Sequence, residues 1–429
     1  MLPAPLAIAL LVLGFAVAVV AVRRVAIRRL GLAHPGVAWL VLTGVFFGPG
    51  SLVLALGGRP GPAPYVGAAA AAFGLALLGS DALARRRRAG EPIDGAPARS
   101  HEPSVAAIRW PLVVALAALA VAVLGPTILQ TGIPFLVRDI TASRAELGGL
   151  IVQPLRVALP GAVTVALLWA IRGESRRRRW LAVAGIVAVA AFEILLASRY
   201  LLAELAATLA VAWLLAGRRM RPAVAAAAVA AALVAFAGIQ VLRAYDDAAG
   251  RALEFAMNRT VNRVVLVQPR TLAALMDRIP SDEDYFLGLT WVRRIAPLFG
   301  RDDVPNLGYW IYPDVVEGEQ ATTGYAAPGW LGEAWANFGW VGIGLFAALG
   351  VAVERLGALV AERLRRLDVP ASTVDAAAAA LLIVFVARTH ALGVVGLAVL
   401  VVVVAVWRLL VGPLGGLSRD VARTLAWRT

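Results

Sequence analysis

Long apolar runs of similar length alternate with short polar stretches along the chain. A helix needs about 20 predominantly apolar residues to cross the hydrocarbon core of a bilayer. Windows of that size predict about eleven transmembrane helices, so the expected fold class is all-α, a polytopic membrane protein. The predicted helices cover residues 3–22, 37–57, 63–84, 110–129, 150–171, 181–198, 200–216, 223–242, 338–354, 374–390 and 392–411.

Composition supports this prediction and excludes other classes of protein. Of the 429 residues, 60% are apolar before the 41 glycines are added, whereas soluble domains reach about 45 to 50% with glycine included. A net charge of +14 raises nucleic acid as a partner, but the arginines lie in short clusters between apolar runs, as in cytoplasmic loops. This arrangement of arginines argues against a nucleic-acid partner. With no cysteine and only three histidines, we also predict no metal and no cofactor.

The arginine clusters also predict an orientation. The first apolar run is followed by Arg23, Arg24, Arg28 and Arg29, so its N-terminus is expected outside the cell. Alternation then places 26 of the 41 arginines on the cytoplasmic side, together with the C-terminus. Nine of the others lie in one long segment, where the positive-inside rule no longer applies. We therefore expect a multi-pass protein of the cytoplasmic membrane.

Three regions follow from this topology. Residues 1–242 form an N-terminal bundle of about eight helices, with a cytoplasmic linker at 85–109 that is rich in glycine and proline. Residues 243–327 form an extracytoplasmic loop, and residues 328–429 form a C-terminal bundle of about three helices. Within the loop we expect a helix over 252–267, a second starting at Pro269, and a third capped by Ser281 with Asp284.

Several ionisable residues fall at or within the outer half of the membrane. Charges at such depth are costly and usually face a bundle interior or a wet cavity, so they are candidates for function. Arginine offers a permanent charge and a planar fork that matches phosphate oxygens, and several arginines around one outer cavity would suit a pyrophosphate. For Arg144 the alternative is a side chain that extends from a helix end to the interface. These candidates include Arg144, Arg156, Arg199, Glu333, Arg388 and His390.

The outer loop is also rich in aromatic residues. Such rings suit either the membrane interface or the faces of sugars, and the sequence leaves both interpretations open. The aromatic residues are Tyr285, Phe286, Trp291, Tyr309, Trp310, Tyr312, Tyr325 and Trp330.

Short motifs in this region resemble those of the Wzy-like oligosaccharide repeat-unit (O-antigen) polymerases. They are Gly132-Ile133-Pro134 with Arg144 downstream, the pair Ser198-Arg199, the stretch 288–313, and the segment 332–339. The likeness covers roughly residues 110–355. It implies a GT-C-like helical bundle that acts as a membrane glycosyltransferase. Such an enzyme takes a growing glycan from an undecaprenyl pyrophosphate carrier and joins it to the next lipid-linked repeat unit on the outer face of the membrane.

The resemblance implies roles for the candidate residues. Cations would stabilise the charge that develops on the departing pyrophosphate, and a carboxylate or imidazole would take the proton of the acceptor hydroxyl. Glu333 is the first choice for this base and His390 the second; an acid near a helix N-terminus can equally be structural. A chain-length regulator and a flippase of the same pathway are the expected protein partners. The expected pyrophosphate-binding residues are Arg144, Arg156, Arg199, Arg259, Arg263, Arg293 and Arg388.

Three alternatives remain. A ligase-like glycan transferase would use the same donor with a different acceptor. A transferase that uses polyprenyl monophosphate sugars should carry an acidic pair in an early outer loop, where residues 58–61 have none. A non-enzymatic polysaccharide or lipid flippase needs charges that line a path to both faces of the membrane.

Overall fold

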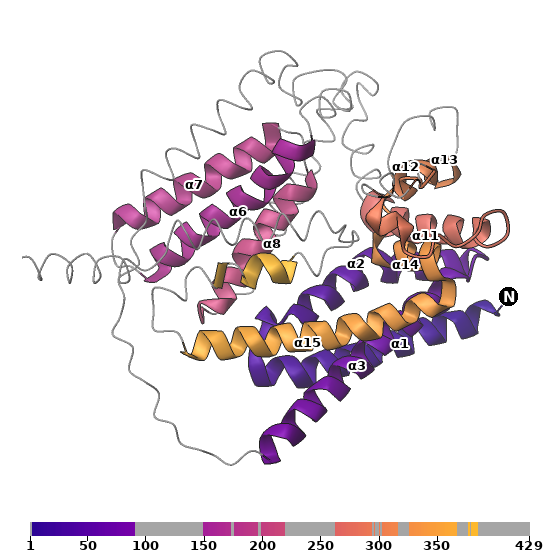
Figure 1. Ribbon diagram of the computed structural model, residues 1–429, viewed down its shortest axis with the longest axis horizontal. Coiled ribbons are helices and arrows are strands. Elements are labelled where there is room, and N and C mark those ends of the chain that lie inside the picture. The colour runs from indigo at the N-terminus through magenta and orange to yellow at the C-terminus, as the bar shows by residue number, and fades with distance from the viewer. Residues whose placement is uncertain are drawn as a thin grey trace, which may run out of the picture. The chain divides into compact units, whose positions relative to one another are not determined.

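Every element in the described part of the chain is helical (Figure 1). The computed structural model describes residues 2–90, 149–172, 176–195, 199–218, 262–293, 296, 300, 303–315, 326–366, 376–377 and 379–384. The chain divides into two compact units. The first comprises Met1–Pro92, Ala235–Leu359 and Phe385–Val395, and the second comprises Ile93–Val234, Val360–Val384 and Gly396–Thr429.

In the described part of the chain, four helical segments are long and apolar enough to cross a membrane, and they lie wholly or mainly in the first unit. They are α1 (Ala4–Arg29), α2 (Pro35–Leu56), Pro62–Arg86 within α3 (Pro62–Gly90), and Gly329–Glu362. The first three match the predicted helices at 3–22, 37–57 and 63–84. The fourth begins nine residues before the predicted 338–354, because a short helix precedes it. Several spans in one chain indicate an integral membrane protein.

Prolines and one histidine mark where these helices begin. Pro35 and Pro62 are the first residues of α2 and α3, where a missing backbone N–H costs nothing. His34 caps α2, since its Nδ1 accepts a hydrogen bond from the backbone N–H of Gly36 at 3.1 Å. At its other end α3 extends to Gly90. The arginine run 85–88 therefore belongs to this helix, and the linker expected over 85–109 does not begin at residue 85.

Helices α1 and α3 run in the same direction and pack closely. A methyl group added at Gly14 would overlap the carbonyl of Gly67, and one added at Gly74 would lie 2.8 Å from the Cα of Ala18. Small side chains let helix backbones approach in this way, as expected for membrane helices whose stability rests on close packing.

Helix α15 (Ile343–Arg366) runs alongside α3, again in the same direction (Figure 1). A methyl group at Gly342 would lie 2.9 Å from the Tyr65 hydroxyl, and one at Gly350 would overlap the carbonyl of Phe73. The N-terminal ends of α1, α3 and α15 therefore share one end of this unit. At the other end of the unit, the C-terminal parts of α1 and α3 meet α15 near Glu354 and Arg355, and we call this the arginine-rich end.

A set of short helices covers the opposite end of the unit. They are η2 (Asn262–Leu266), α11 (Val267–Arg278), η3 (Leu289–Val292), α12 (Leu307–Trp310), α13 (Tyr312–Val315), α14 (Gly329–Phe338) and η5 (Gly339–Gly342). Helix α11 buries Thr271, Leu272 and Leu275. The helix expected after Ser281 is absent: the Ser281 hydroxyl donates back to the carbonyl of Asp277, and residues 281–284 are not helical.

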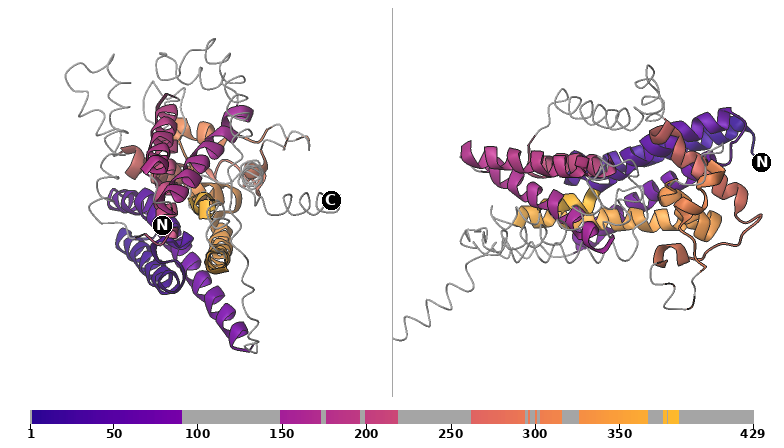
Figure 2. Two further views of the ribbon diagram at one scale, coloured as in Figure 1. Left: turned by 90° about the vertical axis from the view of Figure 1, so that its left-hand side faces the viewer. Right: turned by 90° about the horizontal axis from the view of Figure 1, so that it is seen from above.

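The second unit contains α6 (Gly149–Arg172), α7 (Arg176–Leu195) and α8 (Arg199–Leu215). Helices α6 and α7 lie side by side (Figure 2), and Val163, Val189 and Leu205 join all three helices in one apolar cluster. These helices match the predicted windows at 150–171, 181–198 and 200–216. The windows at 110–129, 223–242 and 392–411 lie outside the described residues, and that at 374–390 is described only in part.

Candidate active site

Helix α14 presents a mixed polar and aromatic face. Trp330, Glu333, Ala334 and Asn337 are spaced at i, i+3, i+4 and i+7, so they share one side of the helix. The Glu333 side chain is partly buried, and in the described part of the chain no arginine forms an ion pair with it. This carboxylate therefore remains able to accept a proton.

Thr290 on η3 holds the Glu333 carboxylate. Its Oγ1 donates a hydrogen bond to Oε2 of Glu333 at 2.8 Å. The side-chain amide of Asn337 donates in turn to Oγ1 of Thr290 at 2.6 Å and to the backbone carbonyl of Glu333 at 2.7 Å. The three side chains form a small network of neutral hydrogen bonds around one carboxylate.

A tight turn fastens the η3 segment to the C-terminal end of α14. The backbone N–H groups of Phe286 and Leu287 donate to the carbonyls of Ala336 and Asn337 at 3.0 and 3.1 Å. The N–H of Gly288 donates to Oδ1 of Asn337 at 2.7 Å. The turn needs left-handed backbone at Leu287 (φ 51°) and Gly288 (φ 91°), a conformation that glycine adopts without strain. It satisfies the last carbonyls of α14 and brings Thr290 against Glu333.

An apolar groove lies beside this network. It has a volume of about 290 Å³. The indole nitrogens of Trp291 and Trp330 are buried, and neither has a hydrogen-bond partner among the described residues. A buried indole N–H usually finds an acceptor, so these two donors could meet polar atoms of a bound molecule. The groove is lined by Trp291, Trp330, Ala334, Leu345, Phe346, Ala348, Leu349 and Ala352.

Most of the described aromatic residues of the segment 243–330 support the core. Tyr285, Phe286 and Trp310 pack against the main apolar cluster, as do Tyr312 and Trp330. The sequence offered a membrane interface or sugar faces for these rings. The structure assigns most of them to packing, whereas Tyr309 is mainly exposed. Tyr325 lies outside the described residues.

Arg278 joins separate parts of the segment 243–327. Its guanidinium lies 4.0 Å from the centre of the Trp310 ring, and its Nη1 lies 3.0 Å from Oδ2 of Asp314. A second acid, Glu283, lies 3.8 Å from its Nη2. These contacts connect α11 with α12 and α13, and give this arginine a structural role.

Of the predicted site residues, Glu333 and Arg293 have described side chains. Arg293 is partly buried at the end of η3, three residues after Thr290, and positions three apart in a 3₁₀-helix lie on the same side. The structure describes the helical backbone of Arg156 in α6, Arg199 in α8 and Arg263 in η2, but not their side chains. Arg144, Arg259, Arg388 and His390 lie outside the described residues.

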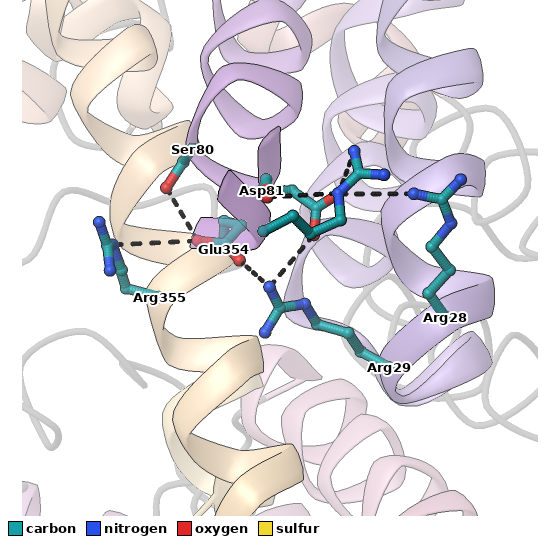
Figure 3. Close-up of polar contacts among 7 residues, drawn as sticks. Arg28, Arg29, Ser80, Asp81, Glu354 and Arg355 are labelled. Carbon is teal, nitrogen blue, oxygen red and sulfur yellow. Dashed lines mark hydrogen bonds and ion pairs between the residues drawn. The ribbon is translucent and has the colours of Figure 1, made fainter. Parts of the chain in front are cut away.

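A second polar cluster lies at the arginine-rich end, where α1, α3 and α15 meet (Figure 3). Nη2 of Arg29 is 3.1 Å from Oδ1 of Asp81 and 2.5 Å from Oε1 of Glu354, and all three side chains are almost fully buried. The Ser80 hydroxyl donates to Oε2 of Glu354 at 2.8 Å. Arg28, Arg85 and Arg355 surround this pair of acids, with about half of each arginine side chain exposed.

His34 lies next to this cluster and is fully buried. Burial and, to a lesser extent, the charge of Arg29 lower its pKa to about 4, against an opposing effect of Asp81. A methyl group at Gly357 of α15 would lie 2.5 Å from Nε2 of His34, so the helix passes close to the ring. The imidazole is therefore neutral near pH 7.

Sequence reasoning did not single out Thr290, Asn337 or the Arg29–Asp81–Glu354 cluster. Thr290 and Asn337 lie inside the motifs that carry the resemblance, but their hydrogen bonds join residues 43 and 47 positions apart. Among the described residues no group of three or more His, Asp or Glu side chains could hold a metal ion. No protein-family model, no curated protein and no solved structure matches this chain.

Proposed function

We propose that the chain is a membrane glycosyltransferase that polymerises oligosaccharide repeat units linked to undecaprenyl pyrophosphate. The reaction takes place on the outer face of the cytoplasmic membrane and builds a cell-surface polysaccharide. One observation carries the proposal: a carboxylate that is free of arginine partners in the described part of the chain, Glu333, lies on the same helix face as an apolar groove with two unsatisfied indole donors.

The proposed orientation rests on the distribution of arginine. The C-terminal parts of α1 and α3 and the middle of α15 gather Arg23, Arg24, Arg28, Arg85 and Arg355 at one end of the first unit. An excess of arginine in short loops is typical of the cytoplasmic side. Glu333 lies at the opposite end, and this supports chemistry on the outer face.

The proposed reaction uses Glu333 as the base. Its carboxylate takes the proton of the acceptor hydroxyl as the new bond forms between the acceptor oxygen and the anomeric carbon of the donor glycan. The bond from that carbon to the phosphate oxygen breaks, and its electron pair leaves with the undecaprenyl pyrophosphate. Thr290 and Asn337 orient the carboxylate, and Arg293, at the end of η3, is a candidate for stabilising the departing anion.

The groove suits the lipid part of the same donor. Leucine, alanine and phenylalanine side chains of α15 form its wall, and they match an isoprenoid chain. The indole N–H groups of Trp291 and Trp330 are suited to donate to phosphate or sugar oxygens at the level of Glu333.

The test is elongation by the purified full-length protein of lipid-linked repeat units in vesicles, followed by the length of the glycan product. Glu333→Gln keeps the shape of the side chain and removes its basicity, so we expect elongation to fall at least 100-fold. Asp282→Asn is the control, because it removes an exposed acid of the same segment and should leave elongation unchanged. Equal product lengths from the wild type and Glu333→Gln would remove Glu333 from the site.

The same preparation separates the alternatives. A ligase would move one glycan to a different acceptor without lengthening lipid-linked chains. A flippase would move labelled lipid-linked glycan across the vesicle membrane without forming glycosidic bonds. The buried charges at the arginine-rich end are the feature that favours this alternative, because a flippase needs charges towards both faces of the membrane. Longer lipid-linked chains are the result that the proposal requires.

A further inference from the structure

The outward face of the C-terminal half of α1 forms a hollow lined by arginine and apolar side chains. It has a volume of about 350 Å³ and is lined by Val20, Arg23, Arg24, Ile27 and Arg28, all of them exposed. The opposite face of the same helix segment packs into the unit through Ala21, Val22, Val25 and Ala26. The helix therefore separates a buried apolar face from an exposed cationic one.

The arginines of this helix have different partners. Arg29 points inward and pairs with Asp81 and Glu354, and Arg28 has a long contact of 3.8 Å with Asp81. Arg23 and Arg24 pair with no acid in the described part of the chain. Two permanent charges thus remain available to an anionic ligand at this hollow.

An exposed apolar stripe leads along α1 to these arginines. Leu6, Leu13, Val20 and Ile27 recur every seven residues, which keeps them on nearly the same side of the helix. Their exposed fractions are 47%, 61%, 50% and 69%. The stripe would lie against lipid tails in a membrane, and it ends where Arg23 and Arg24 begin to line the hollow.

We propose that this face of α1 binds one anionic phospholipid. The phosphodiester lies in the hollow against the guanidinium groups of Arg23 and Arg24, with Arg28 at its edge, and one acyl chain follows Leu13 and Val20. The planar guanidinium matches phosphate oxygens, and each arginine near an anionic membrane surface favours binding by about fivefold. In the proposed orientation the site faces the inner leaflet. A free phosphate would use the same arginines but would leave the apolar stripe uncovered.

The proposal can be tested with the full-length protein in nanodiscs that contain phosphatidylcholine and phosphatidylglycerol in a 3:1 ratio. Native mass spectrometry of the released protein counts the lipids that remain bound. We expect one retained phosphatidylglycerol, with about 30-fold weaker retention in the double variant Arg23→Gln/Arg24→Gln. The matched control is Arg176→Gln/Arg177→Gln, an exposed arginine pair at the start of α7, and it should behave like the wild type.

Two results would overturn the proposal. One is equal retention of phosphatidylglycerol by the wild type and the Arg23/Arg24 variant. The other is displacement of the lipid by millimolar inorganic phosphate, which would show a site for a free anion. Both arginines are exposed, so we expect the variant to unfold at the same temperature as the wild type. That result would show that the variant is folded. No glycan takes part in this assay, so its outcome is independent of the proposed polymerase activity.

Discussion

Two carboxylates of the same long span, Glu333 and Glu354, are held in opposite ways. Glu354 is fully buried and its charge is compensated by Arg29, in a cluster that also contains Asp81. Glu333 accepts a hydrogen bond from the neutral hydroxyl of Thr290, beside a groove. Between them α15 makes close backbone contact with α3 at Gly350. The same residue type thus serves two different environments about six helical turns apart.

The difference lies in what each carboxylate can still do. Glu354 compensates the buried charge of Arg29, so loss of its carboxylate would leave that arginine paired only with Asp81. The Glu333 carboxylate is held by the Thr290 hydroxyl, which itself accepts from the Asn337 amide, and no arginine among the described residues depends on its charge. The charged cluster of Arg29, Asp81 and Glu354 therefore suits a structural role, in which it holds α1, α3 and α15 together. The network of Thr290, Asn337 and Glu333 suits acid–base chemistry.

The largest effect should come from disrupting the charged cluster of Arg29, Asp81 and Glu354. Glu354→Ala leaves Arg29 facing only Asp81 and leaves Ser80 without its acceptor, and we expect a loss of about 3 to 5 kcal/mol in the free energy of unfolding. Thermal or denaturant unfolding in detergent measures this loss. Arg355→Ala should cost less than about 1 kcal/mol, because that side chain is half exposed and lies 4.0 Å from Glu354. Similar losses in both variants would contradict the structural role of the charged cluster.

A dependence of stability on pH should follow from His34. Its pKa is about 4 in the folded protein and about 6.5 when unfolded, so the unfolded chain binds more protons between these values. The contribution of neutral His34 to the free energy of unfolding is therefore fully present above pH 6.5. It is lost, by about 3 kcal/mol, as the pH drops towards 4. His34→Asn keeps a capping side chain for α2 but does not titrate. Unfolding measured across this range should show a smaller decline in the variant, and equal declines would contradict the assignment.

The contact between α3 and α15 can be tested with two glycines. Gly350→Ala places a methyl group against the carbonyl of Phe73 and should cost about 1 to 3 kcal/mol. Gly79→Ala places the same group in open space within α3 and should gain about 0.5 to 1 kcal/mol, because alanine favours the helix. Unfolding temperatures of the two variants should therefore move in opposite directions. A stable Gly350→Ala protein would indicate that the helices can separate at this point.

The sequence predicted the described spanning helices well, for a physical reason. The length and polarity of a membrane helix are set by the bilayer, which acts on each segment locally. The windows at 3–22, 37–57 and 63–84 match α1, α2 and α3 closely. The prediction of a helix after Ser281 is wrong, because the Ser281 hydroxyl donates to the preceding carbonyl of Asp277. The capping pattern does not exclude this local alternative.

Partners far apart in sequence could not be predicted. Asp81 and Glu354 share Arg29 across separations of 52 and 325 residues, and no local pattern relates these positions. The sequence indicates only an effect of Arg29 on orientation, whereas in the structure Arg29 faces inward and its neighbours Arg23 and Arg24 face outward. Helical periodicity indicates which residues share a face, but only the packing of α1, α3 and α15 decides which face meets an acid.

A small effect on stability should arise at the hydrogen-bonded network of Thr290, Glu333 and Asn337. Thr290→Val keeps the shape of the side chain but removes the hydroxyl that donates to Glu333 and accepts from Asn337, and we expect a loss of about 1 kcal/mol. Thr290→Ser retains the hydroxyl and serves as the control. If Glu333 acts as the base, elongation should fall much more than stability in the valine variant, because the carboxylate is no longer oriented. The serine variant should retain most of the activity. A valine variant that loses stability but elongates glycans normally would restrict Thr290 to a structural role, and would separate the hydrogen-bonded network from the chemistry assigned to Glu333.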